Sequence, residues 1–348
     1  MRLVATNRAG WFSLFRFSAL LALLAAQTPV AAHAQPLRLP IDCRLGETCF
    51  IQNWIDLDPG PGRADRACGP LTYNGHDGLD IRVPMRAMRE GVAVKAPADG
   101  VIRAVRDGES DGVYRTTGRT LAPDRDCGNG VVIDHGAGLE TQLCHMRRGS
   151  ITARPGLRVS QGAVMGLVGL SGATEFPHVH ISVRRDGQKI DPFTGAPVAQ
   201  SSCAASPPRP HRGLWDHPPP YLATAIVDMG FTDAPPAQAA RADDAPAAAG
   251  SRLAPAMVAW VIIMGVRRGD DTTLRLLTPD GAILAENRTP HTRDQAQYAL
   301  FAGKRRPGAV WPAGTYRAEV AVRRGGGVVA SRTGTLTVRQ PLQGDARR

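Results

Sequence analysis

The sequence predicts an all-β protein in which an antiparallel β-sheet domain is followed by a small immunoglobulin-like β-sandwich. Short apolar runs alternate with glycine turns between residues 91 and 183, and no long amphipathic helical pattern interrupts them. A proline-rich stretch then separates this region from a second set of strand-like runs. Short strands at regular spacing are typical of antiparallel all-β folds. The 348 residues suffice for two ordinary domains, and 43% apolar and 21% charged residues is a globular composition.

Residues 1–34 have the features of a secretory signal peptide. Arg2, Arg8 and Arg16 precede the apolar core "FSALLALLAA", and Ala32-His33-Ala34 offers a small-x-small cleavage site. An uncleaved anchor is the alternative, but the apolar core is too short to span a bilayer comfortably. We therefore expect a periplasmic or secreted protein. Loss of the three leader arginines would take the net charge from +11 to +8, which suits a polyanionic neighbour such as a cell wall or serves solubility alone.

Six cysteines, all before residue 204, predict up to three disulfides in an exported protein. None belongs to a CxxC pair, so a thiolate zinc site is not expected. The first pairing we predict is Cys127 with Cys144, because these residues flank a hairpin in "GNGVVIDHGAGLETQLCHM". The first domain, with its cysteine-rich start, therefore covers residues 35–203.

The second domain is expected at residues 221–340, after a proline-rich connector at 204–220. The run "APAMVAWVIIMGV" (254–266) is too short for a membrane helix, and its β-branched residues favour a buried strand. No transmembrane segment is expected after signal removal, residues 341–348 are predicted to be a tail, and no nucleic-acid motif is present. The oligomeric state cannot be predicted.

Two groups of polar residues have the spacing of metal ligands. His178 and His180 share one face of a strand, although a His-x-His pair alone is more often structural. His76 and Asp80 are separated by a segment whose Gly78 permits a sharp bend, although a hydrogen bond within a loop would explain this pair equally well. Two histidines and one carboxylate form a catalytic zinc set, but spacing does not tell which of His178 and His180 would bind the ion.

His76-x-x-x-Asp80, a strand ending in His145, and His178-x-His180, in that order, resemble the M23 family of zinc endopeptidases, also called the LytM or lysostaphin-type family. The segment "GVAVKAPADGVI" is similar to the family's first hairpin, and "GLVGLSGATEFPHVHISV" to its approach to the last motif. The resemblance covers about residues 70–195. It implies that His76, Asp80 and His180 hold one Zn²⁺, and that His145 and His178 perform the polar catalysis.

The resemblance further implies that the substrate is the peptide cross-link of peptidoglycan. One departure is Leu143, which stands where the family commonly has a tyrosine two residues before the isolated histidine. The alternative function is a non-catalytic LytM-like module that binds the cell wall or activates other murein hydrolases; a metal carrier is a third. A chelator would inactivate an enzyme and leave a scaffold unaffected.

The remaining histidines and the basic clusters do not join this site by spacing. We expect a structural role for His135, solvent exposure for His211 and His217, and a place in the second domain for His291, while His33 leaves with the signal peptide. The basic clusters of the second domain would meet acidic groups or lie in solvated turns: Arg267-Arg268, Lys304-Arg305-Arg306 and Arg323-Arg324.

Overall fold

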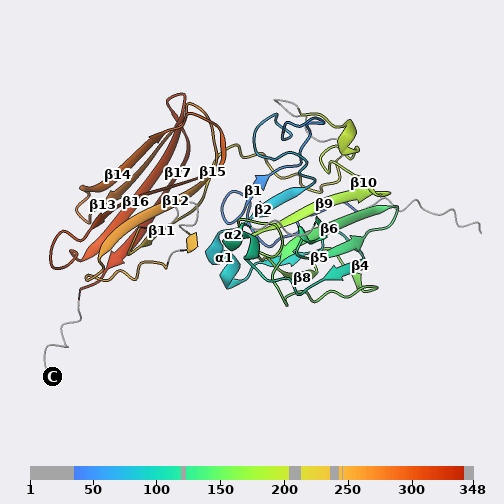
Figure 1. The fold of residues 1–348 in the computed structure, drawn as a ribbon, viewed down its shortest axis with the longest axis horizontal. Helices are drawn as coiled ribbons and strands as arrows, with labels where there is room; N and C mark the ends of the chain where they lie inside the picture. Colours follow the sequence, from blue (N-terminus) through green and yellow to red (C-terminus); the bar gives the residue numbers. More distant parts are fainter. Residues whose placement is uncertain (1–34, 119–122, 204–212, 236–242, 245, 341–348) are drawn as a thin grey trace, which may run out of the picture. The chain divides into compact units, whose positions relative to one another are not determined.

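Nearly every regular element of the chain is a β-strand, which confirms the all-β prediction (Figure 1). The computed structural model describes all residues except 1–34, 119–122, 204–212, 236–242, 245 and 341–348. The predicted signal peptide, the tail and much of the predicted connector lie outside the described residues, as do His33 and His211. No helix within the described ranges is long and apolar enough to cross a membrane.

The first domain is built on an eight-stranded antiparallel sheet. Alternate residues of its central strand, such as Val179 and Ile181, enter the apolar core, so the intervening histidines lie on the opposite face. In spatial order the strands are β1 (Phe50–Asn53), β2 (Leu79–Arg82), β9 (His178–Arg185), β6 (Leu139–Met146), β5 (Asn129–Asp134), β4 (Gly100–Arg106) and β7 (Arg158–Val159), with β10 (Gln188–Lys189) paired to β9.

The predicted hairpin in "GVAVKAPADGVI" is wrong. β3 (Ala93–Lys95) pairs with β8 (Val164–Leu167) in a separate two-stranded sheet, whereas β4 pairs with β5 and β7. After β3, the Ala96 N–H donates to the carbonyl of Ala163, so the chain stays hydrogen-bonded to the segment that precedes β8. The next residue, Pro97, has no N–H and cannot donate a hydrogen bond to β4. The helices are short: α1 (Met85–Glu90), α2 (Val113–Thr117), η1 (Pro123–Arg125) and η2 (Val198–Gln200).

Three disulfides staple the first domain, and the predicted pair Cys127–Cys144 is one of them. It flanks the β5–β6 hairpin, which is confirmed. Cys43–Cys49 closes a small loop, and Cys68–Cys203 ties the segment before β2 to the far end of the domain. Trp215, in the predicted connector, is buried in the core of the first domain, so the end of the connector packs there.

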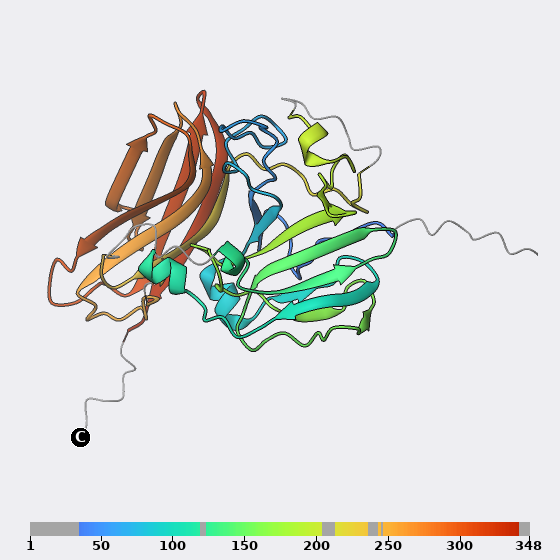
Figure 2. The same cartoon turned by 45° about the vertical axis from the view of Figure 1, so that its right-hand side comes forward.

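The second domain consists of two antiparallel sheets, seen well in Figure 2. Side chains from both sheets form one apolar core. The predicted buried strand is confirmed, because every residue of β12 is buried. The immunoglobulin-like detail remains a prediction. One sheet contains β11 (Ala225–Thr232), β12 (Ala256–Val266) and β15 (Gln295–Arg305), and the other contains β14 (Ile283–Pro290), β13 (Asp271–Leu277), β16 (Gly314–Arg324) and β17 (Gly327–Val338).

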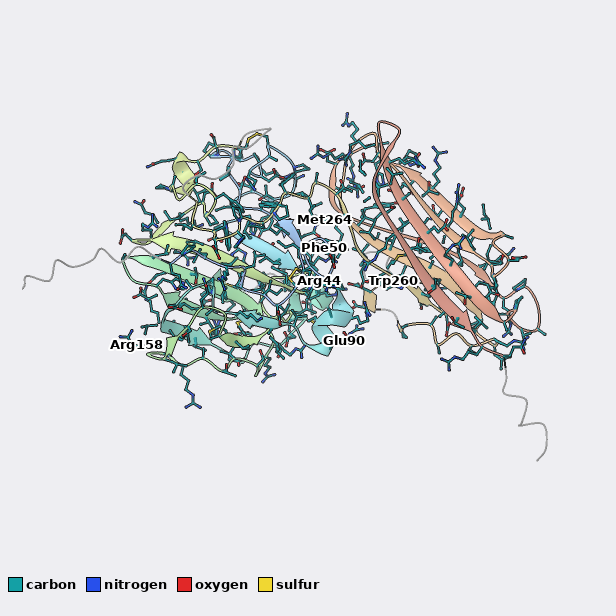
Figure 3. All side chains as sticks on the ribbon, turned by 180° about the vertical axis from the view of Figure 1, so that it is seen from behind. Arg44, Phe50, Glu90, Arg158, Trp260 and Met264 are labelled. Carbon is teal, nitrogen blue, oxygen red and sulfur yellow. A yellow bond between two sulfur atoms is a disulfide. The ribbon has the colours of Figure 1, made fainter. Side chains whose placement is uncertain are left out.

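Residues 34–348 form a single compact unit in which the two β regions contact each other. Phe50 of β1 packs with Trp260 and Met264 of β12, all labelled in Figure 3. Arg115 of α2 forms ion pairs with Asp243 and Asp244, at 3.0 and 2.7 Å, in the segment between β11 and β12. This segment, low in sequence complexity, is thus attached to the first domain at two carboxylates.

Candidate metal centre

The register of two neighbouring strands places Asp80 of β2 directly opposite His180 of β9. His76 lies in the turn that leads into β2, and all three residues are largely buried. His180 Nδ1 lies 2.9 Å from Asp80 Oδ1, and His76 Nε2 lies 3.1 Å from the same oxygen and 3.2 Å from His180 Nδ1. These three residues are brought together as a group able to hold a metal ion.

Gly78 serves a different purpose from the sharp bend that the sequence suggests. Its φ is not in the left-handed region, but a Cβ at this position would lie 2.7 Å from the imidazole of His180 and 2.3 Å from the carbonyl oxygen of Ile181. Only a glycine leaves room for β9 to approach so closely. The residue therefore sets the distance between the ligands on β9 and those around β2.

Neighbouring groups orient the donor atoms toward a common point. His76 Nδ1–H donates to the carbonyl of Trp54 at 2.7 Å, which leaves the lone pair on Nε2, and Asn53 donates to Asp80 Oδ2 at 2.8 Å, which leaves Oδ1 for a metal. Burial alone would raise the pKa of Asp80, but the adjacent His76 and His178 hold it well below its usual value. Ligands about 2.0–2.1 Å from a tetrahedral zinc ion lie about 3.3 Å apart, so this donor set fits zinc.

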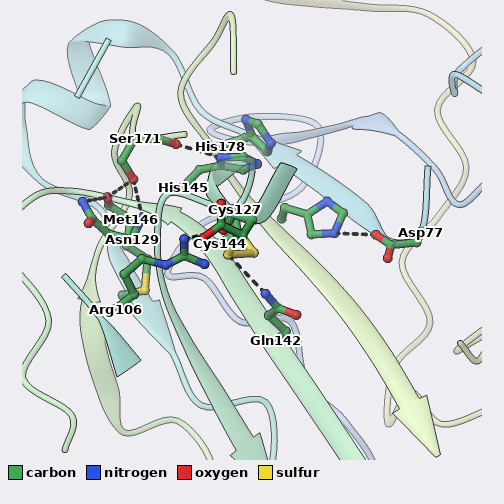
Figure 4. Close-up of a disulfide and its surroundings, with 12 residues drawn as sticks. Asp77, Arg106, Cys127, Asn129, Gln142, Cys144, His145, Met146, Ser171 and His178 are labelled. Carbon is green, nitrogen blue, oxygen red and sulfur yellow. Dashed lines mark hydrogen bonds and ion pairs between the residues drawn. A yellow bond between two sulfur atoms is a disulfide. The ribbon is translucent and has the colours of Figure 1, made fainter. Parts of the chain in front are cut away.

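His178 lies on the same face of β9 as His180, one pleat away. Its Nδ1–H donates to the carbonyl of Phe176 at 2.9 Å, and its Nε2 lies 3.2 Å from Asp80 Oδ1. The imidazole of His145 packs beside it, with ring centroids 4.5 Å apart (Figure 4). The two histidines predicted to be catalytic are therefore adjacent to the three predicted ligands.

A β-bulge places His145 at this position. Asn129 pairs with Met146 and Val131 with Leu143, so Gly130 alone opposes both Cys144 and His145. His145 has a φ of 61°, in the left-handed region, and bulges commonly redirect a side chain next to an active site. Cys127 holds the bulge in two ways. Its side chain forms the disulfide with Cys144, and its backbone carbonyl accepts a hydrogen bond from the His145 N–H at 2.9 Å.

The imidazoles of His145 and His180 differ in their affinity for protons. Burial, with the adjacent His178 and His180, holds the pKa of His145 well below its ordinary value. Its Nδ1–H donates to the carbonyl of Ser171 at 2.8 Å, so Nε2 carries the lone pair. Burial would likewise lower the pKa of His180, but hydrogen bonds to Asp77 and Asp80 raise it to about 9.

A groove of about 970 Å³ contains the cluster. Tyr73, which stacks on His76 with centroids 4.5 Å apart, forms part of its wall, while burial and the nearby Asp80 and Asp77 raise the tyrosine's pKa. Leu143, which replaces the expected tyrosine, is fully buried in the core. Gln297 of the second domain also lines the groove and accepts a hydrogen bond from buried Arg82.

Sequence reasoning missed several groups of this site. The side chain of Asn53 and the carbonyl of Trp54 come from a segment with no recognisable motif. Ser171 lies in a segment that resembles the family, but its backbone carbonyl carries no sequence signal of its own. His135 and His217 behave as expected: both ring nitrogens of His135 have hydrogen-bond partners, and His217 is exposed.

Comparison with known proteins identifies the part of the chain that carries this cluster. Residues 74–192 match the family model described as Peptidase family M23. The chain contains an M23 peptidase domain. This domain holds all five residues predicted from the sequence.

Curated relatives of the M23 domain include proteins from Neisseria. The DD-carboxypeptidase/endopeptidase Mpg of Neisseria meningitidis serogroup B is 32% identical over 125 residues, which is 36% of this chain and 24% of the relative. The protein of the same name from Neisseria gonorrhoeae gives the same figures. The chain therefore spans about a quarter of the length of these relatives.

Solved structures similar to this chain include M23 proteins. A mutant catalytic domain of the prophage-encoded M23 protein EnpA from Enterococcus faecalis is 23% identical, with a TM-score of 0.30, and the match covers 43% of this chain and 94% of that one. A zinc containing peptidase from Vibrio cholerae is 18% identical, with a TM-score of 0.28, over 49% of this chain and 40% of that one.

Proposed function

We propose that this protein is a zinc-dependent endopeptidase that hydrolyses peptide cross-links of bacterial peptidoglycan. The observation that carries this proposal is the convergence of His76, Asp80 and His180 within 3.2 Å of one another in an open groove. The M23 domain and the similarity to proteins named DD-carboxypeptidase/endopeptidase support the same class of reaction.

The three converging donors would hold one Zn²⁺ per chain. Two imidazoles and one carboxylate are a ligand set of catalytic rather than structural zinc sites, which usually have four protein ligands. When bound, zinc would polarise a substrate carbonyl and lower the pKa of a water molecule to about 7.

His145 and His178 provide the proton transfers. The depressed pKa of His145 keeps its imidazole neutral near pH 7, so Nε2 can accept a proton from the attacking water. The Nε2 atom of His178 faces the same cluster, 3.2 Å from Asp80 Oδ1. Because the two rings are adjacent, they can share the transfer of a proton to the leaving amine.

The groove and the disulfides agree with a cell-wall substrate outside the cytoplasm. Arg63, Arg106 and Arg184 line the groove and offer partners for carboxylates of a peptide substrate. Three disulfides form most readily in an oxidising, extracytoplasmic compartment.

The test is to incubate the purified mature protein with isolated peptidoglycan and to identify the released fragments by mass spectrometry. We expect new peptide ends in the cross-links, loss of cleavage with a chelator, and recovery when zinc is restored. A protein that binds peptidoglycan equally well with and without chelator, and releases nothing, would instead be the non-catalytic module.

A further inference from the structure

Three of the four histidines at the site are held through Nδ1 by a backbone carbonyl. His76 donates to Trp54, His145 to Ser171 and His178 to Phe176. These carbonyls fix the orientation of each ring regardless of the side chain at the partner position. His180 is the exception, because its nitrogen away from the cluster has a different kind of partner.

That partner is the carboxylate of Asp77. His180 Nε2 lies 3.2 Å from Asp77 Oδ1, the contact drawn as the dashed line at Asp77 in Figure 4. Asp77 directly follows the ligand His76 in the chain and precedes Gly78, whose missing side chain lets the His180 ring approach. One short turn therefore contributes both a ligand and the group that contacts the ligand on the facing strand.

Two cations hold the Asp77 carboxylate in place. Lys189 Nζ lies 3.2 Å from Asp77 Oδ2, and Arg184 lies 3.8 Å from the same oxygen. Arg184 and Lys189 are cross-strand neighbours in the β9–β10 hairpin, so both project from one register position.

We propose that Asp77 is a positioning residue of the metal centre, which accepts the Nε2–H of His180 and thereby leaves the lone pair of the imidazole on Nδ1, facing His76 and Asp80. A carboxylate in this position fixes the tautomer and ring orientation of a metal-binding histidine and increases its basicity. The inference rests on the proposed zinc site. It adds that the affinity of that site depends on a residue that is not a ligand.

The experiment measures zinc affinity directly, by competition with a chromophoric chelator. Asp77→Ala should weaken zinc binding by about 10- to 100-fold, the usual effect of removing such a partner. Asp77→Asn retains a hydrogen-bond acceptor and should lose less affinity than Asp77→Ala. The matched control is Glu140→Ala, which removes an ion-paired carboxylate from the neighbouring strand β6 without touching a ligand, and it should bind zinc as the wild type does.

A second readout separates positioning from general stability. The ring ¹⁵N shifts of His180 in the zinc-bound protein should show Nδ1 bound to the metal and Nε2 protonated in the wild type, and a mixture of Nδ1-bound and Nε2-bound rings in Asp77→Ala. If Asp77→Ala does not fold, Asp77→Asn with the same two measurements decides the question. Zinc affinity and tautomer unchanged in the variant would overturn the inference, whereas a wild-type protein that binds no zinc would refute the proposed function instead.

Discussion

The two β regions both bury a histidine on a strand or at its end, but the surroundings of these histidines differ. In the second domain, His291 Nε2 bonds the hydroxyl of Thr272 at 2.8 Å and the ring packs edge-on against Tyr298. In the M23 domain, the ring of His145 packs against those of His178 and His180, and these two rings contact the carboxylate of Asp80. Burial alone therefore does not mark a functional histidine; what distinguishes the M23 domain is that several partly satisfied donors converge.

The largest effect is expected when a proposed metal ligand of the M23 domain is replaced and the buried histidine of the second domain is replaced for comparison. His76→Ala or Asp80→Ala should reduce zinc binding and peptidoglycan cleavage to background, because each removes one of three protein ligands. Zinc content after dialysis and fragment release are the measurements. The matched change in the second domain, His291→Ala, should keep both and lower only the free energy of unfolding, by about 1–3 kcal/mol. Full activity in either ligand variant would reject the assignment.

The next effect separates catalysis from metal binding. His145→Ala should leave zinc affinity near the wild-type value, because its side chain is not among the three donors, and should lower kcat by about 10²- to 10⁴-fold through loss of proton transfer. Zinc titration and turnover on a soluble peptide cross-link are measured on the same preparation. A variant that loses zinc in parallel with activity would place His145 among the ligands.

A third effect tests the unequal distribution of covalent cross-links. All six cysteines precede residue 204, so every disulfide lies in the first domain, and Cys127–Cys144 is the one within the residues that match M23. Replacing Cys127 and Cys144 by serine opens a loop with a sequence separation of 17 and should lower the free energy of unfolding by about 3 kcal/mol. Hydrogen exchange should show faster opening of β5 and β6 with unchanged protection in β12 and β16. Equal loss of protection in both regions would show that they unfold together.

The smallest effect concerns the pH dependence of the second domain. Burial would raise the pKa of Asp270, but hydrogen bonds from Arg324 and the Arg267 N–H lower it below its ordinary value. A lowered folded-state pKa stabilises the protein above the unfolded-state value, and this stability is lost as the pH falls through the folded-state value. Asp270→Asn should cost about 1.5–3 kcal/mol at pH 7 and flatten the acid limb of the stability curve below about pH 4. Denaturant unfolding between pH 2 and 7 checks this; parallel curves for both proteins would contradict it.

Much of the fold was predictable because strand periodicity and glycine turns are local signals. The β5–β6 hairpin, the buried strand β12 and the Cys127–Cys144 pair follow from such signals and are confirmed. The pairing of β3 with β8 is not local, since Ala93 and Leu167 are far apart in sequence. The residues between them contain no signal that predicts this register. The predicted hairpin failed at that point.

The candidate site was predictable to a similar extent. The spacing suggested two histidines and a carboxylate without distinguishing His178 from His180, the family resemblance implied His76, Asp80 and His180, and the structure places these three side chains together. The groups that orient these ligands and His145 were not predictable, because the carbonyls of Trp54 and Ser171 and the side chain of Asn53 come from distant segments. Asp77 was visible in the motif, but without the position of His180 its carboxylate had no identifiable partner.

The left-handed backbone of His145 has a consequence for the history and engineering of this protein. Glycine or asparagine would adopt that conformation with less strain, so a selection for thermal stability alone should favour replacing this imidazole. Under the proposed function, a laboratory population evolved only for heat resistance would be free to exchange this imidazole, and with it the proton transfer, for stability.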